Sequence, residues 1–184
     1  MKPRPQRKSP RLQGYDYRQS GAYFVTICTH QRAQMFGAIQ DGEMVFSQVG
    51  NIAMDCLIAV PDHYPSIDLD AFVVMPNHVH AVITIETRFP VGTGLALSAH
   101  MPDNAGVIPT AGVIPTVSLA TVIGSYKSGV TRRIRTASGD VACAVWQGRY
   151  HDHIIRNERA LDAIRDYISN NPARWDEDTF YAGS

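Results

Sequence analysis

Apolar positions along this chain recur with a period of two in some segments and of three to four in others, which predicts a mixture of strands and helices. Residues 22–29 (AYFVTICT) form a β-branched and aromatic run that is typical of a strand. Residues 35–46 carry short apolar runs on either side of an Asp-Gly pair and predict a hairpin. Residues 67–75 and 78–85 are rich in β-branched side chains and predict two more strands.

Three other segments have helical spacing, and each begins at a residue suited to cap a helix. A proline, Pro61 or Pro172, follows the first and the last of them and should end each helix. The three helices are expected over residues 47–60, 118–135 and 157–171.

A fourth strand is expected between the last two helices, from residues 141–146, from residues 150–154, or from both. The order is then strand, helix, strand, strand, helix, strand, helix, which is the split βαβ pattern of a ferredoxin-like domain. We therefore expect an α+β fold: an antiparallel sheet with helices on one face, and a further C-terminal helix. The first and third strands should pair at the centre of the sheet.

The 184 residues are the length of one domain. We expect a single folded domain over residues 20–176, a flexible basic arm at 1–19 and a C-terminal tail at 177–184. Residues 87–116 are rich in Gly, Pro, Thr and Ala, and they contain the hexapeptide AGVIPT twice in succession. We expect this segment to be a disordered loop insertion in the domain.

Positive charge gathers in two acid-free clusters, although the formal net charge is zero. Clusters of this kind fit contact with phosphate groups, and a solvated tail and a solvated helix face are the alternative. The first cluster comprises Lys2, Arg4, Arg7, Lys8 and Arg11, and the second comprises Lys127, Arg132, Arg133 and Arg135.

The remaining composition indicates a cytoplasmic protein without a membrane partner. No apolar run is long enough to span a bilayer, and the basic N-terminal residues lack the apolar core of a signal peptide. The cysteines, Cys28, Cys56 and Cys143, are far apart and odd in number. They predict neither a disulfide framework nor a cysteine zinc site.

Two histidines lie one residue apart in the most apolar strand. Alternate side chains of a strand project from the same face, so His78 and His80 should point together while Val79 packs the other way. Two imidazoles held side by side on a strand can chelate a metal ion. The alternative is one packed histidine and one that faces solvent.

The last helix offers partners for the histidine pair. Tyr167 and Asn171 are four residues apart and therefore share one helical face. Two imidazole nitrogens and an amide oxygen suit Mg²⁺ or Mn²⁺ acting as a Lewis acid, and a positioned tyrosine could attack the polarised phosphoryl group. Tyr167 and Asn171 could equally be a surface tyrosine and a helix-end residue. Tyr126 and Tyr150 compete as nucleophiles, although Tyr126 falls on the apolar stripe of its helix.

Five segments resemble the REP-associated tyrosine transposases, which are relatives of the single-strand insertion-sequence transposases within the His-hydrophobic-His endonuclease superfamily. They occur in the family's order and cover most of the chain outside the tip of the arm and the 87–116 loop. The segments are GYDYRQSGAYFVTICT (14–29), FVVMPNHVHAVI (72–83), SYKSGVTRRI (125–134), WQGRYHDHIIRNE (146–158) and DYISNNPARW (166–175).

The resemblance implies a function and assigns residues to it. His78 and His80 match the metal-binding pair, Tyr167 matches the nucleophile, and Asn171 falls at the third ligand. Family members cleave and rejoin single-stranded DNA at hairpin or palindromic repeats through a 5′-phosphotyrosine intermediate. By the same analogy, the residues expected to contact DNA are Arg4, Arg7, Lys8, Arg11, Lys127, Arg132 and Arg133.

Two rival functions remain open at this point. The same fold could serve as a catalytically silent nucleic-acid-binding domain, since the split βαβ sheet is also the scaffold of RNA-recognition modules. It could also be a metal hydrolase that uses water, with Tyr167 only positioning the substrate. The sequence leaves open whether the protein is a monomer or a homodimer, and whether the tyrosine acts on its own subunit. DNA binding would place this cytoplasmic protein at the nucleoid.

Overall fold

The computed structural model of the chain describes residues 19–86, 117–178 and 180. The expected arm at 1–19, apart from Gln19, and the expected loop at 87–116 lie outside the described residues, as do Arg4, Arg7, Lys8 and Arg11. None of the described helices has the length and apolarity needed to cross a membrane.

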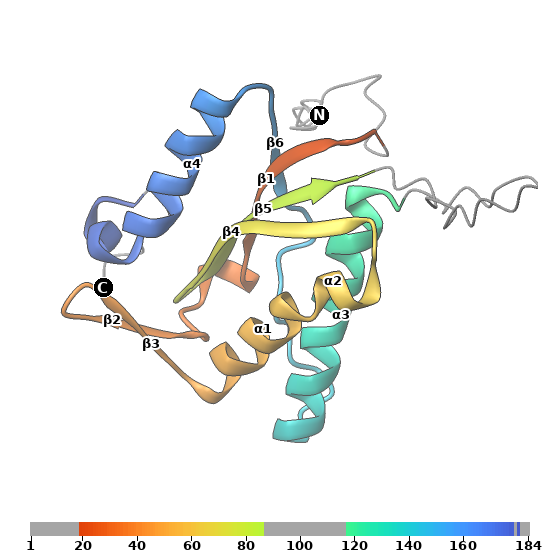
Figure 1. Cartoon of the computed structure of the whole chain (residues 1–184). Coiled ribbons are helices and arrows are strands. Elements are labelled where there is room, and N and C mark those ends of the chain that lie inside the picture. Colours follow the sequence, from red (N-terminus) through yellow and green to blue (C-terminus); the bar gives the residue numbers. More distant parts are fainter. Residues whose placement is uncertain (1–18, 87–116, 179, 181–184) are drawn as a thin grey trace, which may run out of the picture.

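The centre of the fold is a four-stranded antiparallel sheet in the order β4-β5-β1-β6 (Figure 1). The first and third strands of the ferredoxin-like pattern pair at its centre, and the predicted α+β fold is confirmed. The strands are β1 (Gly21–Cys28), β4 (Ile67–Met75), β5 (His78–Ile85) and β6 (His151–Ile155).

The two faces of the sheet are covered by different helices (Figure 1). Tyr23, Val25 and Ile27 of β1 point into the main core, which α1 (Gln48–Ile58), α2 (Val60–His63) and α3 (Leu119–Ser138) complete. Phe24 lies on the opposite face, where Ile168 of α4 (Glu158–Asn170) packs against Val82 of β5. The period of two in the strands therefore gives each face its own apolar layer.

The three longer helices begin where their capping residues predict. Side-chain oxygens of Ser47, Ser118 and Asn157 accept hydrogen bonds from backbone N–H groups in the first turns of α1, α3 and α4. Pro61 does not end the helical region as expected, because it occupies the first turn of the short helix α2. A proline in that position loses no helical hydrogen bond. α3 continues beyond Arg135 to Ser138 and ends at Gly139, which has a left-handed φ of 71°.

The fourth strand comes from the second of its two candidate segments. Residues 151–155 form β6, whereas residues 141–146 form no strand and contribute one bridge, between Trp146 and Thr29. The predicted hairpin is β2 (Gly37–Gln40) and β3 (Glu43–Phe46), which form a separate two-stranded sheet.

An ion pair and an apolar contact hold α4 to the sheet. The register of β4 with β5 shifts between Leu69 and Phe72, and the irregularity includes Asp70. Both oxygens of Asp70 accept hydrogen bonds from Arg165 of α4, at 2.7 and 2.6 Å. Such a two-point contact fixes orientation as well as distance. Beside it, Ile168 packs on Val82.

Replacing Asp70 by Asn should loosen α4 and lower the melting temperature slightly at neutral pH. The hydrogen bonds from Arg165 lower the pKa of Asp70 below its ordinary value of 3.8. Its carboxylate therefore stabilises the fold above that value, and the contribution is lost as the pH falls through the lower folded pKa. Thermal unfolding from pH 7 to pH 2 should show the curves of D70N and the original chain converging in acid. D68N, on the same strand, is the matched control, and an unchanged melting temperature for D70N at pH 7 would contradict the assignment.

Candidate metal centre and tyrosine site

The histidine pair lies at the start of β5, directly after the tight connection from β4. Met75 pairs with His78 across the two-residue turn at Pro76-Asn77, and Val73 pairs with His80. Both imidazoles are buried, with residue exposures of 0% and 1%, and their ring centroids are 4.4 Å apart. The two rings thus lie side by side on the face that α4 covers, while Val79 packs in the core of the other face.

Each imidazole has a hydrogen-bond partner at the nitrogen nearer its own strand. Nδ1 of His78 donates to Oδ1 of Asn77 at 2.8 Å, so in the neutral ring Nε2 carries the lone pair. Nδ1 of His80 lies 2.9 Å from the hydroxyl of Thr26, its partner across the β1–β5 ladder. Contacts of this kind orient a metal-binding histidine and fix its tautomer.

Burial keeps both rings uncharged at neutral pH. Loss of hydration, together with a smaller effect of the charge of Arg32, lowers the pKa of His78 to about 3. Loss of hydration also lowers the pKa of His80 to about 3, with His78 adding to the effect and Asp178 opposing it. Since neutral imidazole is the form that binds metal ions, protons do not compete for either ring near pH 7.

Tyr167 reaches the histidine pair from the third turn of α4. Its hydroxyl is 3.2 Å from Nε2 of His80, and its ring meets that of Phe24 edge-on, with centroids 6.1 Å apart. The side chain stays accessible, because the residue is 43% exposed. Partial burial raises the pKa of the phenol, and the Asp178 carboxylate raises it further. A nearby cation would be needed to offset both effects.

Asn171 follows α4 immediately and is 3% exposed. Its Nδ2 donates to Oδ2 of Asp178 at 2.8 Å. Its Oδ1 is buried and has no hydrogen-bond partner among the described residues. The same is true of Nε2 of His78. A buried acceptor without a partner is costly, so two of them in one site indicate a missing electrophilic partner.

Asp178 also belongs to the site, although the sequence analysis placed it in the C-terminal tail. The short 3-10 helix η2 (Pro172–Glu177) turns the chain back after α4 and brings the carboxylate over the histidines. Its Oδ2 is 3.9 Å from Nε2 of His78 and 3.4 Å from the hydroxyl of Tyr167. The spacing of Asp178 from Tyr167 carries no periodic signal, so the sequence offered only an acidic run at 176–178.

These groups fit a divalent metal ion. Ligand atoms of His78, His80 and Asp178 lie within 4.8 Å of one another. Two neutral imidazoles, one carboxylate and the Asn171 amide oxygen form a mixed nitrogen and oxygen set, which Mn²⁺ and Mg²⁺ accept. The carboxylate supplies negative charge that the other three groups lack.

The predicted cationic residues of α3 do not join this site. Lys127 and Arg132 line a separate pocket, whereas Arg133 pairs with Asp55 of α1 at 3.3 Å. The competing nucleophile Tyr126 is buried and donates to the carbonyl of Ala53 at 3.2 Å, far from the histidines in the fold.

Comparison with family models gives no match. An uncharacterized protein of Haemophilus influenzae (strain Rd) is 35% identical over 177 residues, which cover 95% of this chain and 93% of that protein. Identity at this level over nearly the whole of both chains places them in one family.

Among solved structures, a REP-associated tyrosine transposase bound to a REP hairpin is similar, with a TM-score of 0.55 and 19% sequence identity. The similarity covers 90% of this chain and 74% of that one. The chain therefore belongs to the family of the Haemophilus influenzae protein, and it has the fold of a REP-associated tyrosine transposase, as its sequence motifs indicated.

Proposed function

We propose that the protein is a metal-dependent DNA transposase that cleaves and rejoins single-stranded DNA at hairpin or palindromic repeats through a 5′-phosphotyrosine intermediate. The observation that carries the proposal is the 3.2 Å distance between the Tyr167 hydroxyl and Nε2 of His80. An accessible phenol beside a buried, uncharged histidine pair that could hold a metal ion is suited to nucleophilic attack on a phosphodiester. The solved transposase with the same fold is bound to a REP hairpin, which supports DNA as the partner.

Four side chains would hold the metal ion: His78, His80, Asn171 and Asp178. When bound, Mg²⁺ or Mn²⁺ would supply positive charge that polarises the scissile phosphate and favours ionisation of the neighbouring phenol. The partnerless Nε2 of His78 and Oδ1 of Asn171 are the atoms that gain most from such an ion.

Tyr167 performs the covalent step. Its oxygen forms a bond to phosphorus while the bond from phosphorus to the 3′ oxygen breaks, so the 5′ phosphate stays on the tyrosine and a 3′-OH is released. Because the side chain is 43% exposed, its proton can pass to solvent. Attack by a 3′-OH on the phosphotyrosine reverses the step and rejoins DNA.

The protein's own fold brings nucleophile and histidines together. The two-point Asp70–Arg165 contact and the apolar contact of Ile168 hold α4 on the sheet, and Phe24 packs against both His80 and Tyr167. We infer that the tyrosine acts in cis, on the centre of its own chain.

Replacing Tyr167 by Phe should abolish the covalent adduct, because the attacking oxygen is removed while the ring contacts remain. The substrate is a pool of hairpin-forming single strands with randomised flanks, incubated with Mn²⁺ and resolved on a denaturing gel. We expect the original chain and Y150F to form a protein–DNA adduct and Y167F to form none. Adduct formation by Y167F would overturn the role given to Tyr167. Cleavage by Y167F at the rate of the original chain would overturn it as well.

Removing one ligand should strongly weaken Mn²⁺ binding, measured by calorimetry at pH 7. We expect H78Q to weaken binding on the order of 100-fold or more, since loss of a group that only orients a ligand already costs roughly 10- to 100-fold. D178N should also weaken it, because the site loses its negative charge. H63Q, which changes an exposed histidine elsewhere, is the control. Equal Mn²⁺ affinity for H78Q and H63Q would refute the metal centre.

Thr26 should affect the Mn²⁺ affinity of the same centre although it is not a ligand of the ion. T26V preserves the shape of the side chain but removes the hydroxyl that lies 2.9 Å from Nδ1 of His80. We expect about tenfold weaker Mn²⁺ binding, as for other partners of metal-bound histidines. Melting curves without metal should report any general loss of stability. Unchanged Mn²⁺ affinity would show that this contact does not orient His80.

A further inference from the structure

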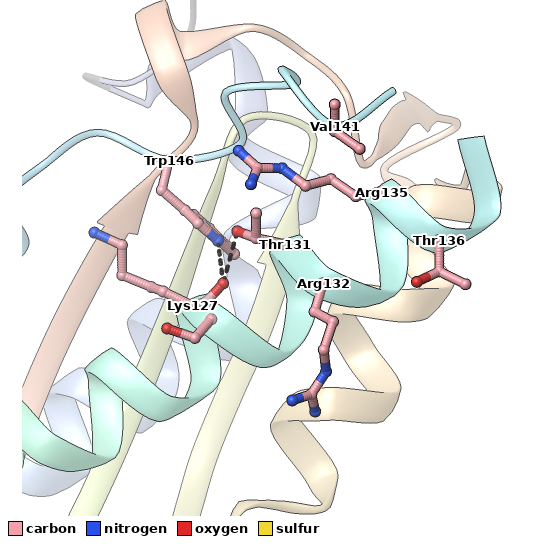
Figure 2. Close-up of a pocket in the computed structure, with 8 residues that line it drawn as sticks. Lys127, Thr131, Arg132, Arg135, Thr136, Val141 and Trp146 are labelled. Carbon is pink, nitrogen blue, oxygen red and sulfur yellow. Dashed lines mark hydrogen bonds between the residues drawn. The ribbon is translucent and has the colours of Figure 1, made fainter. Parts of the chain in front are cut away.

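A cavity that is widely open to solvent lies on α3, on the face of the sheet opposite α4. It has a volume of about 650 Å³, and its lining includes Lys127, Thr131, Arg132, Arg135, Val141 and Trp146. Figure 2 shows Lys127, Arg135 and Trp146 around the space between α3 and the segment that carries Trp146, whereas Arg132 extends from another side of α3 at the edge of the cavity. The volume is within the range of about 300 to 1,000 Å³ that is usual for small-molecule sites.

The lining is positively charged. Three of its residues are cationic, and no carboxylate lines the cavity among the described residues. Nζ of Lys127 and Nη2 of Arg135 donate to the backbone carbonyls of Gln147 and Cys143 at 2.6 and 3.1 Å, which positions both charges without neutralising them. Arg132 is exposed and forms no hydrogen bond or ion pair within the part of the chain that the structure describes. The cavity is therefore suited to a phosphate group.

An aromatic surface lies beside these charges. The indole of Trp146 is fixed by a hydrogen bond from its Nε1 to the carbonyl of Lys127 at 3.1 Å and by packing against the rings of Phe36 and Tyr126. A rigid aromatic ring next to cations is a combination by which proteins hold an unpaired base and its phosphate.

The cavity and the metal centre lie near the same end of β1, on opposite faces of the sheet. Cys28 pairs with His78 across the sheet, and its carbonyl accepts a hydrogen bond from Gln147, the residue after Trp146, at 3.0 Å. Cys28 thus joins the strand of the metal centre to the segment that carries Trp146.

We propose that the α3 cavity binds one nucleotide of the single-stranded DNA that extends from the Tyr167 site, with its phosphate on Arg132 and Lys127 and its base against Trp146. This proposal rests on the proposed function for the identity of the strand. The cavity would hold the DNA on one side of the sheet while the cleavage site holds it on the other.

Photo-crosslinking tests the base contact. The probe is a single-stranded oligothymidylate carrying one 5-iododeoxyuridine, irradiated with the full-length Y167F chain without metal so that no cleavage occurs. We expect mass spectrometry to locate the crosslink on Trp146 and its yield to fall in a chain that also carries W146F, which retains a ring in the packed position. Crosslinks confined to residues outside the cavity would overturn the proposal.

Binding measurements test the phosphate contact. R132A and R133A remove the same charge from adjacent positions of α3, but only Arg132 lines the cavity, and Arg133 pairs with Asp55. We expect R132A to weaken binding of the oligothymidylate about tenfold and to reduce the slope of log Kd against log salt concentration by about one. Both effects should be smaller for R133A. Equal losses would indicate a diffuse charge effect and refute a defined cavity site.

A competition experiment shows whether the cavity binds a nucleotide within a strand or a free nucleotide. Thymidine monophosphate and inorganic phosphate should each displace the oligothymidylate far less well than an unlabelled strand does, because neither spans both sites. Displacement by the monophosphate at equal nucleotide concentration would overturn strand binding and indicate a free-nucleotide site. All of these readouts use a chain that lacks Tyr167, so failure of the tyrosine chemistry and failure of the cavity proposal are distinguishable.

Discussion

The pairing register of β5 is the constraint on which the candidate centre depends. Side chains alternate along a strand, so a slip of one residue would move His78 and His80 into the main core and Val79 towards α4. The two-residue turn after Met75 prevents such a slip on one side, and the ladder with β1 prevents it on the other. The same ladder sets Thr26 opposite His80, so one register determines both the ring positions and a contact that orients one of them.

The centre is assembled from two distant parts of the chain, strand β5 and the segment that begins with α4. The sheet supplies the nitrogen atoms, and the helix with its following turn supplies Tyr167, Asn171 and Asp178. These oxygen atoms stay in place only while α4 remains docked. The contact of Arg165 with Asp70 is therefore coupled to the site even though both residues lie on the surface. A change that loosens α4 from the sheet should therefore also disturb the geometry of the site.

Periodicity predicted much of this arrangement but could not predict all of it. The strand period places His78 and His80 on one face of β5, and the helical period places Tyr167 and Asn171 on one face of the last helix. In the structure, the hydroxyl of Tyr167 lies beside His80, and Asn171 is joined to the histidines through Asp178. Asp178 follows the 3-10 helix η2, in which Trp175 is buried, and no periodic pattern in the sequence indicates where this turn places the carboxylate. Residues 141–146 form no strand for a similar reason. Tertiary contacts of Trp146, with Thr29 and Phe36, override the local β-propensity of the segment.

The charge distribution shows how a chain with zero net charge could bind a polyanion, as the proposed function requires. Lys127, Arg132 and Arg135 gather around one cavity, and the acidic Asp178 lies at a centre where a divalent ion would reverse its effect. Without the ion, the carboxylate raises the pKa of Tyr167 and would repel a phosphate. With a divalent ion bound, the same carboxylate would be a ligand in a site of net positive charge. DNA binding and chemistry would then depend on the metal together, while the cavity on α3 would hold the strand regardless of it.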